Sequence, residues 1–402
     1  MLHGKALITV ENLKSASGAL HPVQEAMVET GGSQCGYCTP GIVMSLFGLY
    51  KNHDHPSRNE IDEALTGNLC RCTGFKPIVE AAARACIHRG VDSLTDGEEK
   101  LARVLSSIPR DSALITTPHQ QYFQPHTLPE AVRFLHEHPA AVVMCGATDV
   151  ALRVTKKHEL LRTILDLSCV EELKTLHEDD EALHIGAGVV LSDIVPHVER
   201  LFPALAEMFA VFGSLQIRNL ATLGGNIGSA SPIGDTLSAL IPHKAMVVLQ
   251  SADGTREMPL DGFVTGYRRT ARRADELIVK IVIPKNHAGA LMRWYKVSKR
   301  KDLDISTVSA GFRVELDGSA CVREAVLAYG GMAERVKRAS SVEQFLHGKP
   351  WNRETLEAAM SRLDGDFTPI SDARGSAQFR SVVAKNLLLK FWSETRAGNN
   401  GR

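Results

Sequence analysis

Four cysteines grouped in two short pairs constrain this chain more than any other feature of its sequence. They follow the pattern Cys35-x2-Cys38, then 31 residues, then Cys70-x-Cys72. Four thiolates in close pairs are typical ligands of either a zinc ion or an iron–sulfur cluster. The pattern therefore predicts one four-thiolate site.

The spacing favours a [2Fe–2S] cluster, with zinc and unligated cysteines as the alternatives. Structural zinc usually uses two CxxC pairs, whereas the second pair here is CxC. Both pairs precede predicted helix N-termini, where free N–H groups favour an anionic centre. Four glycines around the pairs would let backbone amides approach sulfur and tune the potential of a cluster: Gly36, Gly41, Gly67 and Gly74.

The segment from 20 to 90 reads as four helices, predicted over 22–29, 39–50, 61–65 and 77–89. Thr39 and Pro40 are an N-cap followed by proline at the first helical position. Ser57 and Glu60 form a capping-box pattern before the third helix. Both cysteine pairs then lie in loops, the first before helix two and the second before helix four.

The low cysteine content and the lack of targeting or membrane-spanning patterns indicate the cellular compartment. A secreted disulfide scaffold would be shorter and richer in cysteine than this chain of 402 residues with eight cysteines. Residues 1–10 show no signal-peptide pattern, and no apolar run approaches the roughly 18 to 20 residues of a membrane span. These features predict a cytoplasmic protein with no membrane contact. Four cysteines in apolar contexts are predicted to be small hydrophobes: Cys86, Cys145, Cys169 and Cys321.

Lys plus Arg and Asp plus Glu both total 46, so the formal net charge is zero. A dedicated nucleic-acid binder would show a basic excess. We therefore expect no nucleic-acid partner.

The chain is expected to be multidomain, α and α+β. Residues 18–92 form the four-helix domain, and the polar segment 93–116 is predicted to be a linker. Residues 117–290 alternate helices (128–137 and 203–212) with strands (141–145, 164–167, 184–188, 245–250 and 276–283). Residues 291–396 hold a hairpin of 311–316 with 322–329, then helices near 341–347, 353–363 and 380–395.

Two glycine-rich loops are candidates for phosphate binding, with ordinary turns as the alternative. The chain lacks the Walker pattern and a GxGxxG after a strand, so a Rossmann site is not expected. Small residues would let backbone N–H groups reach a pyrophosphate. The candidates in the first loop are Gly146, Ala147, Thr148 and Asp149. Those in the second are Thr222, Gly225, Asn226, Ser229, Ser231 and Asp235.

Other features have two readings each. The basic run Arg268, Arg269, Arg272 and Arg273 could hold an anionic cofactor such as NAD, although a solvated face is favoured. Phe212 could lie against an adenine or end an apolar helix. The histidines show no metal-ligand spacing, and no Ser/His/Asp order appears.

The segments 34–41 (QCGYCTPG) and 67–75 (GNLCRCTGF) closely resemble the helical [2Fe–2S] domain of the molybdenum hydroxylases, the xanthine dehydrogenase and aldehyde oxidase relatives. The two glycine-rich loops resemble the FAD domain of the same family, a vanillyl-alcohol-oxidase-like (PCMH-type) fold. Residues 295–306 resemble the segment beside the flavin ring, where Lys296 matches a lysine that contacts FAD. Residues 307–396 resemble the family's α+β flavoprotein C-terminal domain.

The resemblance implies an electron-transfer iron–sulfur flavoprotein, similar to the small subunit of a bacterial-type xanthine dehydrogenase. A partner subunit in a hetero-oligomer would carry the molybdenum cofactor and oxidise hypoxanthine or xanthine. Electrons would pass through [2Fe–2S] to FAD and then to NAD, with no catalytic acid or base on this chain. The alternatives are the same role in a hydroxylase acting on an aldehyde or heteroaromatic, and a non-catalytic remnant. Tyr267 lies where the family places a residue near the nicotinamide, and a core aromatic is its other reading.

The family's plant-type ferredoxin domain, with a second [2Fe–2S] cluster, would precede the helical domain, and its cysteines are absent here. Residues 6–10 read as the last strand of that domain. We therefore expect residues 1–17 to be the remnant of a truncated ferredoxin domain, with a first domain on another polypeptide as the alternative.

Overall fold

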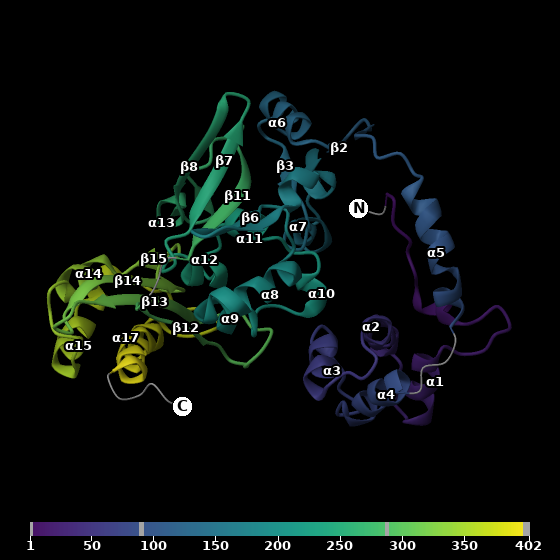
Figure 1. Ribbon diagram of the computed structural model, residues 1–402, viewed down its shortest axis with the longest axis horizontal. Coiled ribbons are helices and arrows are strands. Elements are labelled where there is room, and N and C mark those ends of the chain that lie inside the picture. The colour runs from purple at the N-terminus through teal and green to yellow at the C-terminus, as the bar shows by residue number, and fades with distance from the viewer. Residues whose placement is uncertain (1–2, 88–91, 286–288, 397–402) are drawn as a thin grey trace. The chain divides into compact units, whose positions relative to one another are not determined.

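The computed structural model describes residues 3–87, 92–285 and 289–396 (Figure 1). The chain divides into two compact units. The first comprises Met1–Asp111 with Ser214–Ile217, and the second comprises Ser112–Gly213 with Arg218–Arg402.

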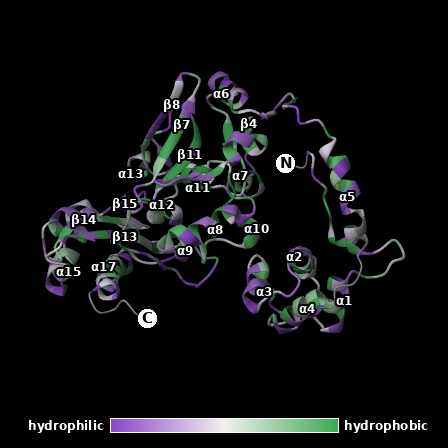
Figure 2. Cartoon of the chain, in the orientation of Figure 1, coloured by the Kyte–Doolittle hydropathy of each residue, from purple (hydrophilic) through white to green (hydrophobic). Residues whose placement is uncertain are grey.

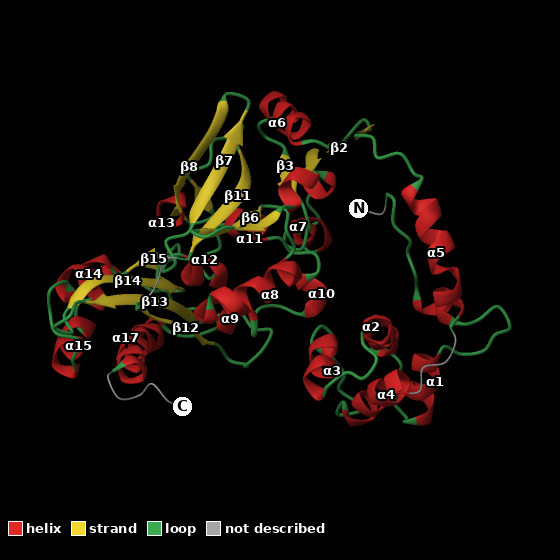
Figure 3. Ribbon diagram, in the orientation of Figure 1, coloured by secondary structure: helices red, strands yellow, loops and turns green. Residues whose placement is uncertain are grey.

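The regular elements of the first unit are all helices in its described residues, joined by loops (Figure 3). Its elements are η1 (Val10–Leu13), α1 (Pro22–Glu29), α2 (Thr39–Asn52), α3 (Arg58–Leu65), α4 (Lys76–Ile87) and α5 (Ser93–Ser106). The four predicted helices are thus present as α1 to α4, and the predicted end at 88–89 lies outside the described residues. Ser57 accepts from the Glu60 amide and Glu60 from the Ser57 amide, as the capping-box pattern predicts. Apolar side chains from all four helices form one core around Ile42, Leu46 and Ile78.

The strand predicted over residues 6–10 is wrong. These residues pair with no strand in the described chain, and η1 begins at Val10. An isolated strand leaves its N–H and C=O groups unpaired, so it forms only beside a partner. Here the segment instead packs Ile8 and Val10 against the helical core, and the Val10 carbonyl accepts from the Gln24 side chain at 3.2 Å.

The linker predicted over 93–116 is wrong for most of its length, because α5 occupies Ser93–Ser106. The buried Asp92 caps this helix by accepting from the amides of Leu94 and Thr95. Lys51 of α2 donates to Thr95 and pairs with Glu98 at 2.9 Å. These polar contacts hold the start of a helix whose apolar residues Leu94, Leu101, Val104 and Leu105 recur at helical spacing.

The second unit begins with a four-stranded sheet of order β1-β2-β4-β3. Its strands are β1 (Ala113–Thr116), β2 (Gln121–Gln124), β3 (Val142–Met144) and β4 (Thr163–Asp166). The helices α6 (Leu128–Glu137) and α7 (Val150–Thr155) accompany it, and two short turns follow, η2 (Leu167–Cys169) and η3 (Glu171–Lys174). β3 and β4 run parallel, so the loop after β3 leaves the sheet at its carboxyl edge.

A five-stranded antiparallel sheet of order β5-β6-β11-β7-β8 follows. Its strands are β5 (Leu176–Glu178), β6 (Ala182–Gly186), β7 (Met246–Ser251), β8 (Gly254–Pro259) and β11 (Leu277–Pro284). Buried and partly exposed residues alternate along β7 and β11, and both strands carry hydrophobic colouring in Figure 2. The ribbon β9 (Val264–Gly266) with β10 (Arg269–Thr270) precedes β11.

The helices between β6 and β11 carry the second glycine-rich loop. They are α8 (Leu191–Leu201), α9 (Pro203–Phe209), α10 (Leu215–Arg218), α11 (Leu223–Gly228), α12 (Asp235–Leu240) and α13 (Leu260–Phe263). The helix predicted over 203–212 ends at Phe209, and the chain then turns through Gly213, which has φ +59°.

The last part is a four-stranded antiparallel sheet covered by helices, as predicted. Its strands, in sheet order, are β12 (Leu291–Val297), β13 (Val308–Leu316), β14 (Val322–Gly330) and β15 (Lys337–Arg338). Its helices are α14 (Ser340–Leu346), α15 (Arg353–Met360), α16 (Leu363–Asp366) and α17 (Ala377–Thr395). Across the described ranges, we find no helix with both the length and the apolar character required to cross a bilayer.

Candidate iron–sulfur and dinucleotide sites

The four predicted cysteine ligands meet in the first unit as two close pairs. The Sγ atoms of Cys35 and Cys72 are 3.5 Å apart, and the thiols of Cys38 and Cys70 lie within hydrogen-bonding reach of each other. Gly36 and Gly74, beside the two motifs, adopt φ +80° and +64°, a conformation that glycine accepts without a steric cost. The loops thus bring each cysteine of the first motif to one cysteine of the second.

Hydrogen-bond donors and burial set the thiol pKa values. The Thr73 hydroxyl, 3.1 Å from the Cys70 sulfur, lowers the pKa of Cys70 to about 7. The Tyr37 backbone amide lowers the pKa of Cys35, whereas burial raises the pKa of Cys38. The hydrogen bond from Cys72 to Cys35 raises the pKa of Cys72. Donors aimed at sulfur favour the thiolate, which is the form that binds metal.

A cavity of about 750 Å³ lies in the second unit, between the two glycine-rich loops. Its wall includes the end of β3, the start of α7, α11 and the loop before α12. Eleven of the twelve residues predicted to bind a cofactor line it: Gly146, Ala147, Thr148, Asp149, Phe212, Thr222, Gly225, Asn226, Ser229, Ser231 and Asp235. The tertiary structure thus joins two loops that lie more than 70 residues apart in the sequence.

The glycines of the two loops permit a close backbone approach. A Cβ on Gly146 would lie 1.6 Å from the carbonyl oxygen of Leu220, and one on Gly224 would lie 2.5 Å from the Cβ of Ala187. Either contact is far below van der Waals separation, so only glycine fits. These positions hold the two loops against each other and against the end of β6.

Side chains in the second loop are held by local hydrogen bonds. The Thr222 hydroxyl caps α11 by accepting from the Gly225 amide at 3.1 Å. The Asn226 side-chain oxygen accepts from the Thr236 hydroxyl, which leaves its NH₂ group as a donor. Ser229 donates to the Asn226 carbonyl at 2.7 Å.

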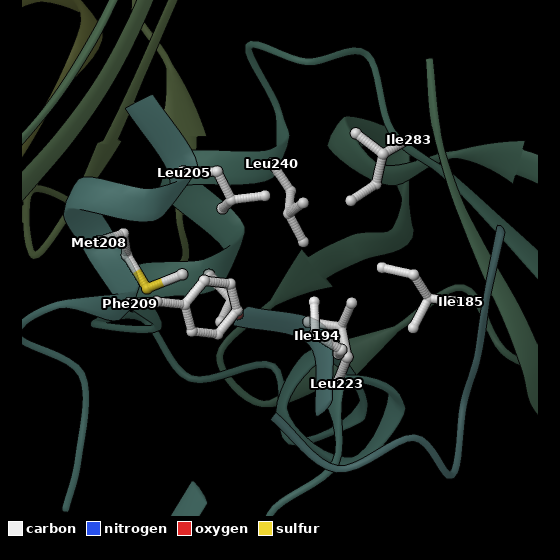
Figure 4. A pocket seen from close by; sticks show the side chains of 9 residues that line it. Ile185, Ile194, Leu205, Met208, Phe209, Leu223, Leu240 and Ile283 are labelled. Carbon is white, nitrogen blue, oxygen red and sulfur yellow. The ribbon is translucent and has the colours of Figure 1, made fainter. Parts of the chain in front are cut away.

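An apolar cluster packs against α11 through Leu223 (Figure 4). Leu223 of α11 points into it, while Gly224, Gly225, Asn226 and Gly228 line the cavity. The other labelled side chains of the cluster come from β6, α8, α9, α12 and β11: Ile185, Ile194, Leu205, Met208, Phe209, Leu240 and Ile283. The glycine-rich segment is therefore one face of a helix whose other face is core.

Lys296, the twelfth predicted residue, does not line the cavity but contacts a residue that does. Its Nζ lies 2.8 Å from Asp235 Oδ2, and both side chains are only 7% exposed. Ser306 donates to the other Asp235 oxygen at 2.6 Å. Lys296 therefore acts on the cavity through Asp235.

The sequence favours a solvated face for the arginine run, and the structure places two of its four arginines on the cavity wall. Arg268 and Arg272 line the cavity, whereas Arg269 and Arg273 are exposed and do not line it. Tyr267 is 63% exposed, so its reading as a core aromatic is wrong. No sequence pattern separates the four arginines, because β10 and the following turn orient each of them differently.

Comparison with known proteins matches three successive segments of the chain to three domain families. Residues 9–83 match the family described as [2Fe-2S] binding domain. Residues 118–286 match FAD binding domain in molybdopterin dehydrogenase, and residues 293–395 match CO dehydrogenase flavoprotein C-terminal domain. The expected fold class is thus confirmed.

The curated relatives are longer than this chain. It is 31% identical over 464 residues to xanthine dehydrogenase/oxidase of Gallus gallus, covering 97% of this chain and 34% of the relative. It is 30% identical over 449 residues to aldehyde oxidase 1 of Bos taurus, covering 98% and 34%. The chain therefore spans about a third of the length of these relatives.

Solved structures share the fold of the second unit. A chain of carbon monoxide dehydrogenase from Hydrogenophaga pseudoflava is 26% identical with a TM-score of 0.63, covering 69% of this chain and 96% of that one. A chain of quinoline 2-oxidoreductase from Pseudomonas putida 86 is 24% identical with a TM-score of 0.63, and the match covers 71% of this chain and 99% of that one. This second likeness is one of fold only.

The three domains, in this order, place the chain in the molybdenum hydroxylase family of oxidoreductases. It carries the [2Fe–2S]-binding and FAD-binding parts of such an enzyme.

Proposed function

We propose that this chain is the electron-transfer subunit of a xanthine dehydrogenase. It receives electrons from a partner subunit that holds the molybdenum cofactor, and it passes them through a [2Fe–2S] cluster and FAD to NAD⁺. The observation that carries this proposal is the presence, on one chain, of a paired-thiolate site and a glycine-lined cavity of dinucleotide size.

The paired thiolates suit two irons better than one zinc. Each iron of a [2Fe–2S] cluster takes two thiolates, and the pairs Cys35 with Cys72 and Cys38 with Cys70 supply these. A zinc ion needs all four sulfurs around one point. Within the described residues, no three His, Cys, Asp or Glu side chains gather in that way.

The cavity suits FAD in both size and lining. Its volume lies within the roughly 300–1,000 Å³ common for cofactor pockets. The loop residues Gly146 to Asp149 and Thr222 to Asp235 offer backbone amides and small polar side chains to a diphosphate. Phe212, on the same wall, offers an aromatic face to the adenine.

Bound FAD exchanges two electrons, whereas the cluster carries one at a time, so together they join molybdenum chemistry to hydride chemistry. The residues of this chain hold and orient these groups. We assign no general acid or base here, because oxidation of the substrate belongs to the partner subunit.

The choice of a purine substrate rests on the curated relatives. The 31% identity to a xanthine dehydrogenase/oxidase barely exceeds the 30% identity to an aldehyde oxidase. An aldehyde-oxidising complex is therefore the second candidate, with the same role for this chain.

The test uses the purified full chain and its complex. We expect flavin and iron–sulfur absorbance, about two irons per chain, and bleaching of the flavin by NADH. The complex with a molybdenum subunit should reduce NAD⁺ with xanthine and not with an aldehyde. A colourless protein that holds zinc would refute the cofactor assignment, and aldehyde-dependent turnover would favour the second candidate.

A further inference from the structure

The charged side chains on the cavity wall are almost all neutralised by ion pairs. Asp149 lies 3.6 Å from Arg268, and Asp235 lies 2.8 Å from Lys296. Arg153 donates to Glu159 at 2.9 Å, and Glu276 accepts two hydrogen bonds from Arg256, at 2.6 and 2.8 Å. Among the described residues that line the cavity, these pairs leave a single charge without a salt-bridge partner, on Arg272.

Arg272 is held in place by neutral groups. Its guanidinium donates to the backbone carbonyls of Glu276, at 2.5 Å, and Ala274, at 3.4 Å. The carboxylates of Glu276 and Asp275 act on Arg272 electrostatically but form no salt bridge with it, and that of Glu276 is bound by Arg256. Burial lowers the pKa of Arg272, but a guanidinium remains charged at any physiological pH.

A charge that is partly buried without a salt-bridge partner is unfavourable on its own. The same charge becomes favourable when an anion enters, because Coulomb attraction is strong where water is excluded. The backbone amides of the glycine-rich loops provide only partial charges, so Arg272 is, among the described residues of this wall, the full charge without a salt-bridge partner that an anion can neutralise.

We infer that Arg272 is the electrostatic anchor for the diphosphate of the dinucleotide in this cavity. The inference rests on the proposed function for the presence of a dinucleotide, and it adds the residue that supplies the net positive charge. The two cavity-lining arginines then differ in role: Arg268 is neutralised by Asp149, whereas Arg272 holds its charge for the ligand.

The experiment titrates FAD into the full chain freed of flavin and follows flavin fluorescence at several salt concentrations. Arg272→Gln should weaken FAD binding about tenfold or more, the effect of losing a charge-assisted contact. It should also flatten the salt dependence between about 50 and 500 mM. Arg272→Lys, which keeps the charge, should restore most of the affinity. Arg269→Gln is the matched control and should bind FAD like the wild type.

The outcomes separate this inference from the proposed function. If wild type binds FAD and Arg272→Gln binds it within about twofold, the inference is wrong and the proposed function stands. Equal losses in Arg272→Gln and Arg269→Gln, or an unchanged salt slope, would also overturn the inference. Thermal unfolding without FAD identifies a variant that fails to fold. If Arg272→Gln does not fold, Arg272→Lys is the test: a folded Arg272→Lys that keeps the positive charge but binds FAD no better than a variant without it contradicts the inference. A wild type that binds no FAD refutes both.

Discussion

Lys296 of β12 forms a buried ion pair with Asp235, the first residue of α12, with Nζ and Oδ2 2.8 Å apart. The two residues are 61 positions apart in the sequence, and they join the antiparallel C-terminal sheet to the wall of the cavity. Asp235 is held on its other oxygen by Ser306. The carboxylate that faces the cavity is thus positioned entirely by the C-terminal domain.

Breaking this pair should destabilise the protein strongly. Asp235→Asn or Lys296→Met would leave the partner charge buried and unpaired, which costs about 3–5 kcal/mol. Urea unfolding of the second unit measures the loss. The matched control is Glu357→Gln, which breaks the exposed pair with Arg353 and should cost less than about 0.5 kcal/mol. Equal effects in both variants would contradict the structural role of the buried pair.

The four clustered cysteines should be distinguishable from the isolated ones. Cys35→Ser or Cys70→Ser should remove the cluster, because each replaces one of two thiolates in a close pair. Iron content and visible absorbance should fall, while bound flavin remains. Cys321→Ser, which changes a cysteine of the second unit, should retain full iron content. Normal iron in the first two variants would remove these cysteines from the ligand set.

A methyl group at Gly146 should damage the cavity. Gly146→Ala places a Cβ 1.6 Å from the Leu220 carbonyl oxygen, so the two loops must separate. We expect a loss of about 1–3 kcal/mol in stability and weaker FAD binding, measured by unfolding and fluorescence titration. Gly97→Ala in α5, where nothing lies within 4 Å of the added carbon, is the control and should be neutral or stabilising. Tight FAD binding by Gly146→Ala would show that the loops can move apart freely.

The buried Arg380 should stabilise the second glycine-rich loop through its contact with Gly331. Its guanidinium, 2% exposed, donates to the carbonyls of Thr307 and Gly331 and to Asp372. The Gly331 amide in turn donates to the Pro232 carbonyl beside the cavity at 2.9 Å. Arg380→Met should therefore lower both stability and FAD affinity. Restored flavin affinity in Arg380→Lys would show that the charge and its contact with Asp372 suffice.

The partner of Arg380 predicts a pH dependence. Hydrogen bonds from the Arg374 amide and from Arg380 outweigh burial and lower the pKa of Asp372 from 3.8 to about 2. A lowered carboxyl pKa contributes stability that is present above about pH 4 and is lost as the pH falls toward 2.

The stability difference between wild type and Asp372→Asn should accordingly shrink as the pH falls from about 6 to about 3, as measured by urea unfolding. A difference that stays constant with pH would argue against the ionised Asp372.

Local signals predicted much of the fold. The capping box at Ser57 and Glu60 and the proline after Thr39 mark the starts of α3 and α2, because caps act within one turn of the chain. The helix α5 was missed because its many polar residues favoured a linker, although Asp92 caps it locally and its apolar residues recur at helical spacing. The strand predicted over residues 6–10 failed for the opposite reason: its local pattern is suitable, but no neighbouring strand completes it.

The sequence by itself determined which residues carry the chemistry. The cysteine spacing and the two glycine-rich loops name the thiolate site and the cavity wall, since thiolate ligands and close backbone approach require those residue types. Only the tertiary structure decided how they combine. It pairs Cys35 with Cys72, places Lys296 behind Asp235, and brings two of four neighbouring arginines, Arg268 and Arg272, to the cavity wall. These relationships depend on burial and on which charges find counter-ions, and both are properties of the folded chain.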